Sequence, residues 1–270
     1  MPRHLPLRVS LTILTASAAL AASLALPGCA GGDDAATGGA PDASARVTGP
    51  VTVLAAASLT EVFTQLGTDF EAAHPGTTVT FSFAASSTLA QQINAGAPGD
   101  VFAAASPTTM ATVTDAGNAA GQPQVFARNQ LVIAVAQGNP LGISGLADLT
   151  GPAVKTAICA EQVPCGAVAQ RVLVASGVDL EPATLERDVK AALAKVRLGE
   201  ADAALVYRTD VAAVSDVTGV EFGESAVARN DYPIVTLRDA GNRAGAEAFI
   251  DFVRADQASA TLLAAGFQRP

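Results

Sequence analysis

VTVLAAASLT, residues 51–60, combines an apolar run, small residues and a hydroxyl at Ser58 just before a helical pattern begins. The same order returns in TFSFAASSTL, residues 80–89, where the hydroxyl belongs to Ser86. Each stretch predicts a β-strand, at about 51–57 and at 78–83, that runs directly into a helix. The first N–H groups of a helix lack internal partners and carry partial positive charge, so a hydroxyl beside them favours an anion. One such serine is usually an ordinary helix cap, but two of them with small neighbours indicate a binding site.

Strands and helices alternate along the rest of the chain. Further strands are predicted at 100–104, 125–136, 154–159, 203–207 and 233–237, and helices at 59–74, 87–95, 107–116, 166–176, 188–198, 242–255 and 257–265. This βα alternation predicts an α/β fold with mostly parallel sheets flanked by helices. The two long strands suit two lobes joined by two crossovers, with lobe 1 at 50–129 and 235–270 and lobe 2 at 130–234. Ligands of such folds bind beyond the carboxyl ends of the strands.

The first 28 residues have the pattern of a signal peptide and not of a folded domain. Two arginines precede an apolar segment at residues 9–26, and Leu-Pro-Gly-Cys follows at 26–29. This order predicts a lipoprotein with its new N-terminus at Cys29, where acylation would tether it to the outer face of a membrane. A plain signal peptide with an incidental cysteine is the alternative. Residues 29–49 are rich in Gly, Ala, Asp and Thr and predict a flexible tether.

Composition argues against several classes of partner. The formal net charge is −9, and losing the two arginines of the signal peptide would make it −11. Such an acidic surface argues against binding to nucleic acid and against a polybasic patch that would bind a membrane surface.

The cysteines predict a disulfide and no metal site. Cys159 and Cys165 remain after Cys29 is assigned to lipid, and in an oxidising compartment they predict a disulfide. His74 is the one histidine left in the mature chain and ends a predicted helix, so no bare metal cation is expected.

Catalytic motifs are missing from the sequence. Hydrolysis at Ser58 or Ser86 would need a base, and His74 lies at the far end of a helix from Ser58. There is no G-x-S-x-G elbow, no Walker A loop and no G-x-G-x-x-G fingerprint. The chain has no tryptophan and two tyrosines, which disfavours an aromatic clamp for sugars or bases. The sequence therefore predicts a binding protein without a cofactor and not an enzyme.

Six short motifs together resemble the molybdate-binding proteins of ABC transporters. They follow in order across residues 51–267: AAASLT (55–60), FAASSTLA (83–90), QINAGAPGDVF (92–102), VPCG (163–166), DVKAAL (188–193) and VY (206–207). Each motif alone is weakly specific, whereas six in this order and spacing are a strong signal.

The resemblance implies a two-lobed, type II periplasmic-binding-protein fold that closes over one tetrahedral oxyanion. From lobe 1 it assigns Ser58 and Ser86 as ligands, each through its hydroxyl and backbone N–H. From lobe 2 it assigns the backbone N–H groups of Cys165 and Val189 and the hydroxyl of Tyr207. Without the resemblance, Val189 would be a core residue and Tyr207 a phenol bonded within the fold. The family often has alanine where Cys165 stands, which leaves the main-chain ligand in place.

The resemblance implies capture of molybdate, and also tungstate, at the outer face of the cell membrane for delivery to an ABC transporter permease. We expect a monomer that binds no nucleic acid and meets the membrane through its lipid. A cage of neutral donors would reject phosphate species that carry protons, and sulfate would fit it loosely. The alternatives are a binding protein for another oxyanion such as sulfate or thiosulfate, a lipid-anchored serine hydrolase, and a surface adhesion lipoprotein.

Overall fold

The computed structural model describes residues 47–226 and 229–270. The predicted signal peptide, the lipidated Cys29 and residues 29–46 of the predicted tether lie outside these residues. Within the described part of the chain, no helix combines the length and the apolar character needed to cross a membrane.

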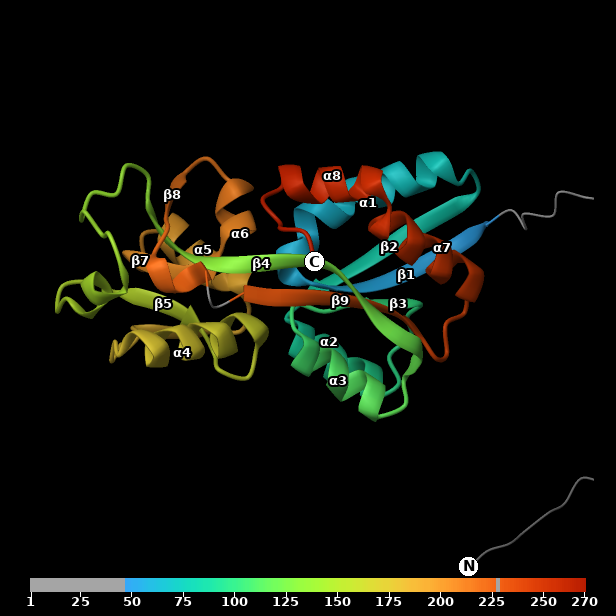
Figure 1. Cartoon of the computed structure of the whole chain (residues 1–270), viewed down its shortest axis with the longest axis horizontal. Helices are drawn as coiled ribbons and strands as arrows, with labels where there is room; N and C mark the ends of the chain where they lie inside the picture. Colours follow the sequence, from blue (N-terminus) through green and yellow to red (C-terminus); the bar gives the residue numbers. More distant parts are fainter. Residues whose placement is uncertain (1–46, 227–228) are drawn as a thin grey trace, which may run out of the picture. The chain divides into compact units, whose positions relative to one another are not determined.

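Three parallel strands open the described chain (Figure 1). Strand β1 (Gly49–Ala56) pairs with β2 (Thr77–Ala84) on one side and β3 (Val101–Ala103) on the other. The helical segments joined to them are η1 (Ala57–Leu59), α1 (Thr60–Ala73), α2 (Ser86–Asn94) and α3 (Pro107–Asp115). Helices α7 (Arg243–Arg254) and α8 (Asp256–Ala264) return from the end of the chain to pack on β1 and α1.

A second set of parallel strands follows in the middle of the chain. Strand β5 (Thr156–Cys159) pairs with β6 (Thr184–Glu186) and β7 (Ala203–Tyr207). The other elements of this part are η2 (Leu146–Thr150), α4 (Pro164–Ser176), α5 (Val189–Arg197), α6 (Arg208–Ala212), β8 (Val217–Val220) and η3 (Gly223–Ala226). Asp188 caps α5, and Pro164 occupies the first turn of α4, where its missing N–H costs nothing.

Two long strands connect these sets. Strands β4 (Ala119–Ala136) and β9 (Arg229–Leu237) run antiparallel to each other. Strand β9 also pairs with β3, and β4 with β7 and β8, so the sheet order is β2-β1-β3-β9-β4-β7-β5-β6 with β8 on β4. The predicted α/β fold with two crossover strands is confirmed, and these two strands supply the antiparallel pairs of the sheet.

The buried side chains form separate cores on the two sides of the crossing strands. One core is rich in phenylalanine and includes Phe63, Phe70 and Phe249. Alternate residues of β1 and β3 point to the opposite sheet face, where a smaller cluster forms around Phe102. The other large core lies almost wholly within residues 131–222. We propose that these cores are the two lobes, with the chain passing between them along β4 and β9.

Candidate functional site

A pocket of about 20 Å³ lies where four helical segments begin. Its lining residues are Ala56, Ala57, Ser58, Ala85, Ser86, Ala105, Val163, Pro164, Cys165, Asp188, Val189 and Tyr207. All five residues assigned from the sequence to an oxyanion site are therefore brought together here. Ser86 and Val189 are the first residues of α2 and α5, Cys165 is the second residue of α4, and Ser58 lies in η1. At these positions a helix has no internal acceptor for the backbone N–H.

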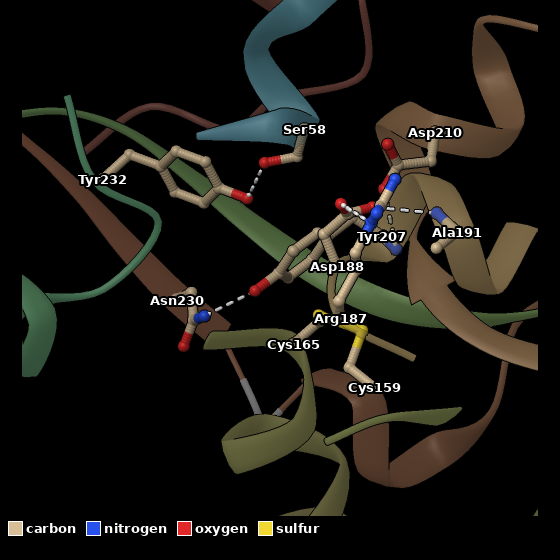
Figure 2. The surroundings of a disulfide bond; sticks show 10 residues. All are labelled: Ser58, Cys159, Cys165, Arg187, Asp188, Ala191, Tyr207, Asp210, Asn230 and Tyr232. Atoms are coloured by element: carbon tan, nitrogen blue, oxygen red, sulfur yellow. Dashed lines mark hydrogen bonds and ion pairs between the residues drawn. A yellow bond between two sulfur atoms is a disulfide. The ribbon is translucent and has the colours of Figure 1, made fainter. Parts of the chain in front are cut away.

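The two serine hydroxyls do not cap their own helices. The cap positions are held by Ala56 and Ala85, neither of which has a side-chain acceptor. Ser86 Oγ instead accepts a hydrogen bond from the backbone N–H of Ala105 at 2.9 Å. Ser58 Oγ lies 2.9 Å from the hydroxyl of Tyr232 on β9 (Figure 2). The structure thus gives both serines a place in the pocket and no capping role.

Tyr207 ends β7 and presents a neutral phenol to the pocket. Its hydroxyl accepts a hydrogen bond from Asn230 Nδ2 at 2.7 Å (Figure 2). The residue is 1% exposed, and this burial raises the pKa of the phenol well above its ordinary value. Tyr207 therefore keeps its proton throughout the physiological pH range and remains able to donate.

Asp188 is the one charged residue among those lining the pocket. Its Oδ1 accepts the backbone N–H of Ala191 at 2.8 Å, as Figure 2 shows, so the carboxylate serves as the cap of α5. No lysine or arginine lines the pocket. The chemistry offered to a ligand is therefore that of hydroxyls and helix N-terminal N–H groups.

A disulfide between Cys159 and Cys165 ties the end of β5 to the start of α4 (Figure 2). The two Cα atoms are 5.7 Å apart, and six positions separate them in the sequence. Because Cys165 lines the pocket, the bridge restrains the loop that carries one of the assigned backbone N–H groups.

Residues 51–268 match the family described as bacterial extracellular solute-binding protein. The molybdate-binding protein ModA of Mycobacterium tuberculosis is 41% identical over 246 residues, which cover 91% of this chain and 93% of that protein. The chain belongs to the ModA family of bacterial extracellular solute-binding proteins. Members of this family bind solutes and are not enzymes, so the predicted absence of catalysis agrees with the family.

Solved structures of two other proteins show the same α/β periplasmic-binding-protein fold. The periplasmic molybdate-binding protein of Azotobacter vinelandii has a TM-score of 0.71 at 24% identity, covering 82% of this chain and 99% of that one. The sulfate-binding protein SubI of M. tuberculosis also has a TM-score of 0.71, at 18% identity, covering 82% of this chain and 86% of that one. The ModA-family fold is thus shared by proteins named for different oxyanions.

A charged cluster that the sequence did not reveal lies beside the pocket. Lys190, next to Val189, contacts Glu61 of α1 at 2.7 Å and Asp210 of α6 at 3.0 Å. The Asp210 side chain is 0% exposed and also accepts the backbone N–H of Tyr207 at 3.2 Å. The Lys190–Glu61 ion pair joins helices that belong to the two different cores. It therefore spans the boundary between the proposed lobes.

Burial gives Asp210 an unusual titration. Desolvation raises the pKa of its carboxyl to about 6, and the opposing pull of Lys190 does not cancel this effect. The ordinary pKa is 3.8. Between these two values the folded protein holds a proton that the unfolded chain has lost. The stability contributed by this group is present below pH 3.8 and is lost as the pH rises through about 6.

We therefore expect Asp210→Asn to remove a pH-dependent part of the stability. The unfolding free energy of the wild type, relative to this variant, should fall by roughly 2–3 kcal/mol between pH 4 and pH 7, since each pKa unit is worth about 1.4 kcal/mol. Urea unfolding of both proteins at several pH values measures the difference. A constant difference would show that the Lys190 ion pair already keeps Asp210 ionised at pH 4.

Other titratable groups form no metal site in the part of the chain that the structure describes. No three His, Cys, Asp or Glu side chains gather there in a way that could hold a metal ion. His74 caps the C-terminus of α1 and packs with its ring 4.4 Å from that of Phe70. It has the structural position that its sequence context predicts.

Proposed function

We propose that this protein binds molybdate, and also tungstate, for an ABC transporter. The observation that carries the proposal is that the residues bearing three hydroxyls and two helix N-terminal N–H groups all line one pocket, which no lysine or arginine lines. Hydrogen bonds from such donors to an anion are charge-assisted and about twice as strong as neutral ones. The pocket of about 20 Å³ is far smaller than the roughly 300–1,000 Å³ of sites for larger ligands, which favours an ion of a few atoms.

Apart from Asp188, whose carboxylate caps α5, the polar groups proposed to meet the ligand are donors, and such a set favours an oxyanion that carries no proton. A protonated phosphate species would place its own donor against the donors of the pocket, and this mismatch lowers its affinity. Sulfate carries no proton at neutral pH, so it remains the alternative ligand, and the shared fold of a sulfate-binding protein keeps it open. The relative named for molybdate at 41% identity favours molybdate.

We also propose where the protein works. Family membership makes it an extracellular solute-binding protein. The signal-peptide pattern ending at Cys29 supports a lipid anchor on the outer face of the cell membrane, on its periplasmic or extracellular side. From there a monomer would deliver its ligand to the membrane permease of the transporter.

Calorimetry with four anions tests the ligand assignment. The protein to use is the fragment from residue 46 onward, without the predicted signal peptide and most of the predicted tether, titrated with molybdate, tungstate, sulfate and phosphate. We expect tight binding of molybdate and tungstate, weaker binding of sulfate and no measurable binding of phosphate. Tighter binding of sulfate than of molybdate would replace the proposed ligand by the alternative.

Removing either serine hydroxyl should weaken binding without a matching loss of stability. A hydrogen bond to a charged group contributes roughly 1.5–3 kcal/mol, so Ser58→Ala and Ser86→Ala should each raise the Kd for molybdate about tenfold or more. Ser106→Ala is the matched control, because Ser106 caps α3 by accepting the N–H of Thr109 at 3.2 Å and does not line the pocket. The control should lose about 1 kcal/mol of stability and keep its affinity. Unchanged affinity in both pocket variants would contradict the site assignment.

A further inference from the structure

Asn230 and Arg171 lie behind the pocket and outside every motif that predicts it. Asn230, on β9, is 3% exposed and donates through Nδ2 to the Tyr207 hydroxyl at 2.7 Å (Figure 2). Arg171, on α4, donates through Nη2 to Asn230 Oδ1 at 3.1 Å. A guanidinium can only donate, so this bond fixes which end of the Asn230 amide faces Tyr207. The NH₂ end therefore points at the phenol oxygen.

This contact controls the direction of the phenol proton. The O–H bond of a phenol lies in the plane of the ring, because the oxygen is conjugated with it, so the proton has two favourable positions. The N–H donor of Asn230 disfavours the position on its own side of the oxygen. The Tyr207 proton then turns to the other side, where it is available to the pocket that Tyr207 lines. In this orientation the hydroxyl donates to a ligand and does not accept from it.

The other two pocket hydroxyls have comparable partners behind them. Ser86 Oγ accepts the backbone N–H of Ala105 at 2.9 Å. Ser58 Oγ lies 2.9 Å from the Tyr232 hydroxyl, and the more acidic phenol is the better donor of that pair. Because each hydroxyl accepts a hydrogen bond on the side away from the pocket, its own proton is free to point into the pocket.

We propose that Asn230, held in place by Arg171, is a positioning residue that makes Tyr207 an obligate donor and so sets the preference for unprotonated oxyanions. The inference rests on the proposed function for the identity of the anion, but not for the orientation of the hydroxyl. A protonated oxyanion such as hydrogen phosphate needs an acceptor in the pocket, and Tyr207 held in this way does not supply one.

Asn230→Asp keeps the shape of the side chain and reverses the polarity of the atom that faces Tyr207. A carboxylate accepts, so the phenol proton should turn away from the pocket and leave a lone pair facing the ligand. Arg171 stands beside the new carboxylate and favours folding of the variant. We expect the Kd for molybdate, measured by calorimetry, to rise about tenfold or more, and the ratio of molybdate to phosphate affinity to fall.

Tyr207→Phe provides the control background. With no hydroxyl left to reorient, Asn230→Asp should change the Kd by no more than about twofold in that background. Equal losses in both backgrounds would mean that the added charge or a disturbed fold causes the effect, and would overturn the proposal. Arg171→Met, at an exposed position, gives a second test: its smaller loss of affinity should also disappear when Tyr207 is phenylalanine.

A measurement without ligand separates this inference from the proposed function. The ring-mode doublet of tyrosine in Raman spectra changes when a phenol passes from accepting to donating a hydrogen bond. The chain has two tyrosines, Tyr207 and Tyr232, and only Tyr207 contacts Asn230 by a hydrogen bond. Asn230→Asp should shift the doublet of the ligand-free protein towards the donor pattern, and an unchanged doublet would overturn the role of Asn230. Failure of the wild type to bind molybdate would instead refute the proposed function and leave this result standing.

Discussion

Gly166→Ala is expected to destabilise the protein by about 3 kcal/mol and to raise the Kd for molybdate about tenfold or more. Gly166 is the third residue of α4, where the first turn passes over the end of β5. A Cβ atom there would lie 2.0 Å from the carbonyl oxygen of Ala160 and 2.6 Å from that of Cys159. Both neighbours are backbone atoms, so the overlap is relieved only if the loop or the helix moves.

Helix propensity alone predicts the opposite sign for this substitution. Alanine is more favourable than glycine in a helix interior by about 1 kcal/mol. The overlap with Ala160 outweighs this gain. The displaced segment includes Cys165, which lines the pocket and whose backbone N–H we propose as a ligand. Binding should therefore fall together with stability.

Thermal unfolding and calorimetry of the variant measure both effects. For a chain of this size, 3 kcal/mol corresponds to a melting temperature lower by about 6–12 °C. Gly145→Ala is the control, since a Cβ there meets no atom within 4 Å and the residue has φ of −170°, an ordinary extended value. It should change stability by no more than about 0.5 kcal/mol. A Gly166→Ala protein that melts and binds like the wild type would show that the β5–α4 loop adjusts easily.

The strand-to-helix boundaries were the most predictable part of this fold. The strand before Ser58 and the strand that ends at Tyr207 were both placed within two residues of their observed bounds. Each of these strands is buried and is followed directly by a helical segment, so apolar runs and helix starts mark its ends clearly. Strands β6 and β8 and helix α6 were missed, because segments of three to five residues carry too little pattern.

The long strand β4 was predicted from Val125, but it begins at Ala119. Gly121 and Pro123 interrupt its pattern, and the structure accommodates them with register shifts between Ala120 and Gln124 and between Val125 and Ala127. Local sequence cannot show that a partner strand continues across such irregularities. β9 likewise starts at Arg229, ahead of the predicted 233, which left Asn230 and Tyr232 outside the predicted element.

The candidate site likewise contains some residues that local sequence predicts and others that it does not. Ser58 and Ser86 were accessible to residue-level reasoning, because each hydroxyl stands between a strand and a helix. Tyr207 also stands at a strand end, but only the resemblance selected its hydroxyl as a ligand. The backbone of Val189 was likewise selected by resemblance alone, since its side chain is an ordinary buried apolar group. The partners behind the hydroxyls were not predictable, because contacts such as Ser58 with Tyr232 join residues 174 positions apart. Such pairs follow from the pairing of β9 with β4 and β3, which is a property of the whole sheet.

Replacing Cys159 and Cys165 together with alanine should leave a folded protein that releases molybdate faster. Closing a loop of this length contributes about 2 kcal/mol on the chain-entropy account, so that much stability should be lost. The larger effect is expected on binding. The intervening Glu161 and Gln162 are exposed, and two short backbone hydrogen bonds, Ala160 N–H to Glu186 and Val163 N–H to Ala160, restrain the loop besides the bridge. Without the disulfide, the Cys165 N–H must be ordered when the ligand arrives, and that cost weakens affinity mainly through the dissociation rate.

A variant that loses a similar amount of stability elsewhere in the fold distinguishes ordering of the ligand loop from a general loss of stability. Val113 is 0% exposed in the small cluster around Phe102 and does not line the pocket, so Val113→Ala should lose about 2 kcal/mol and keep its affinity. Stopped-flow release of molybdate from the wild type, the double alanine variant and Val113→Ala compares the three proteins directly. Faster release in the double variant alone would assign the disulfide to the ligand loop. Release at the wild-type rate would show that the two backbone hydrogen bonds and the burial of Cys165 already fix the N–H, which would confine the disulfide to a role in stability.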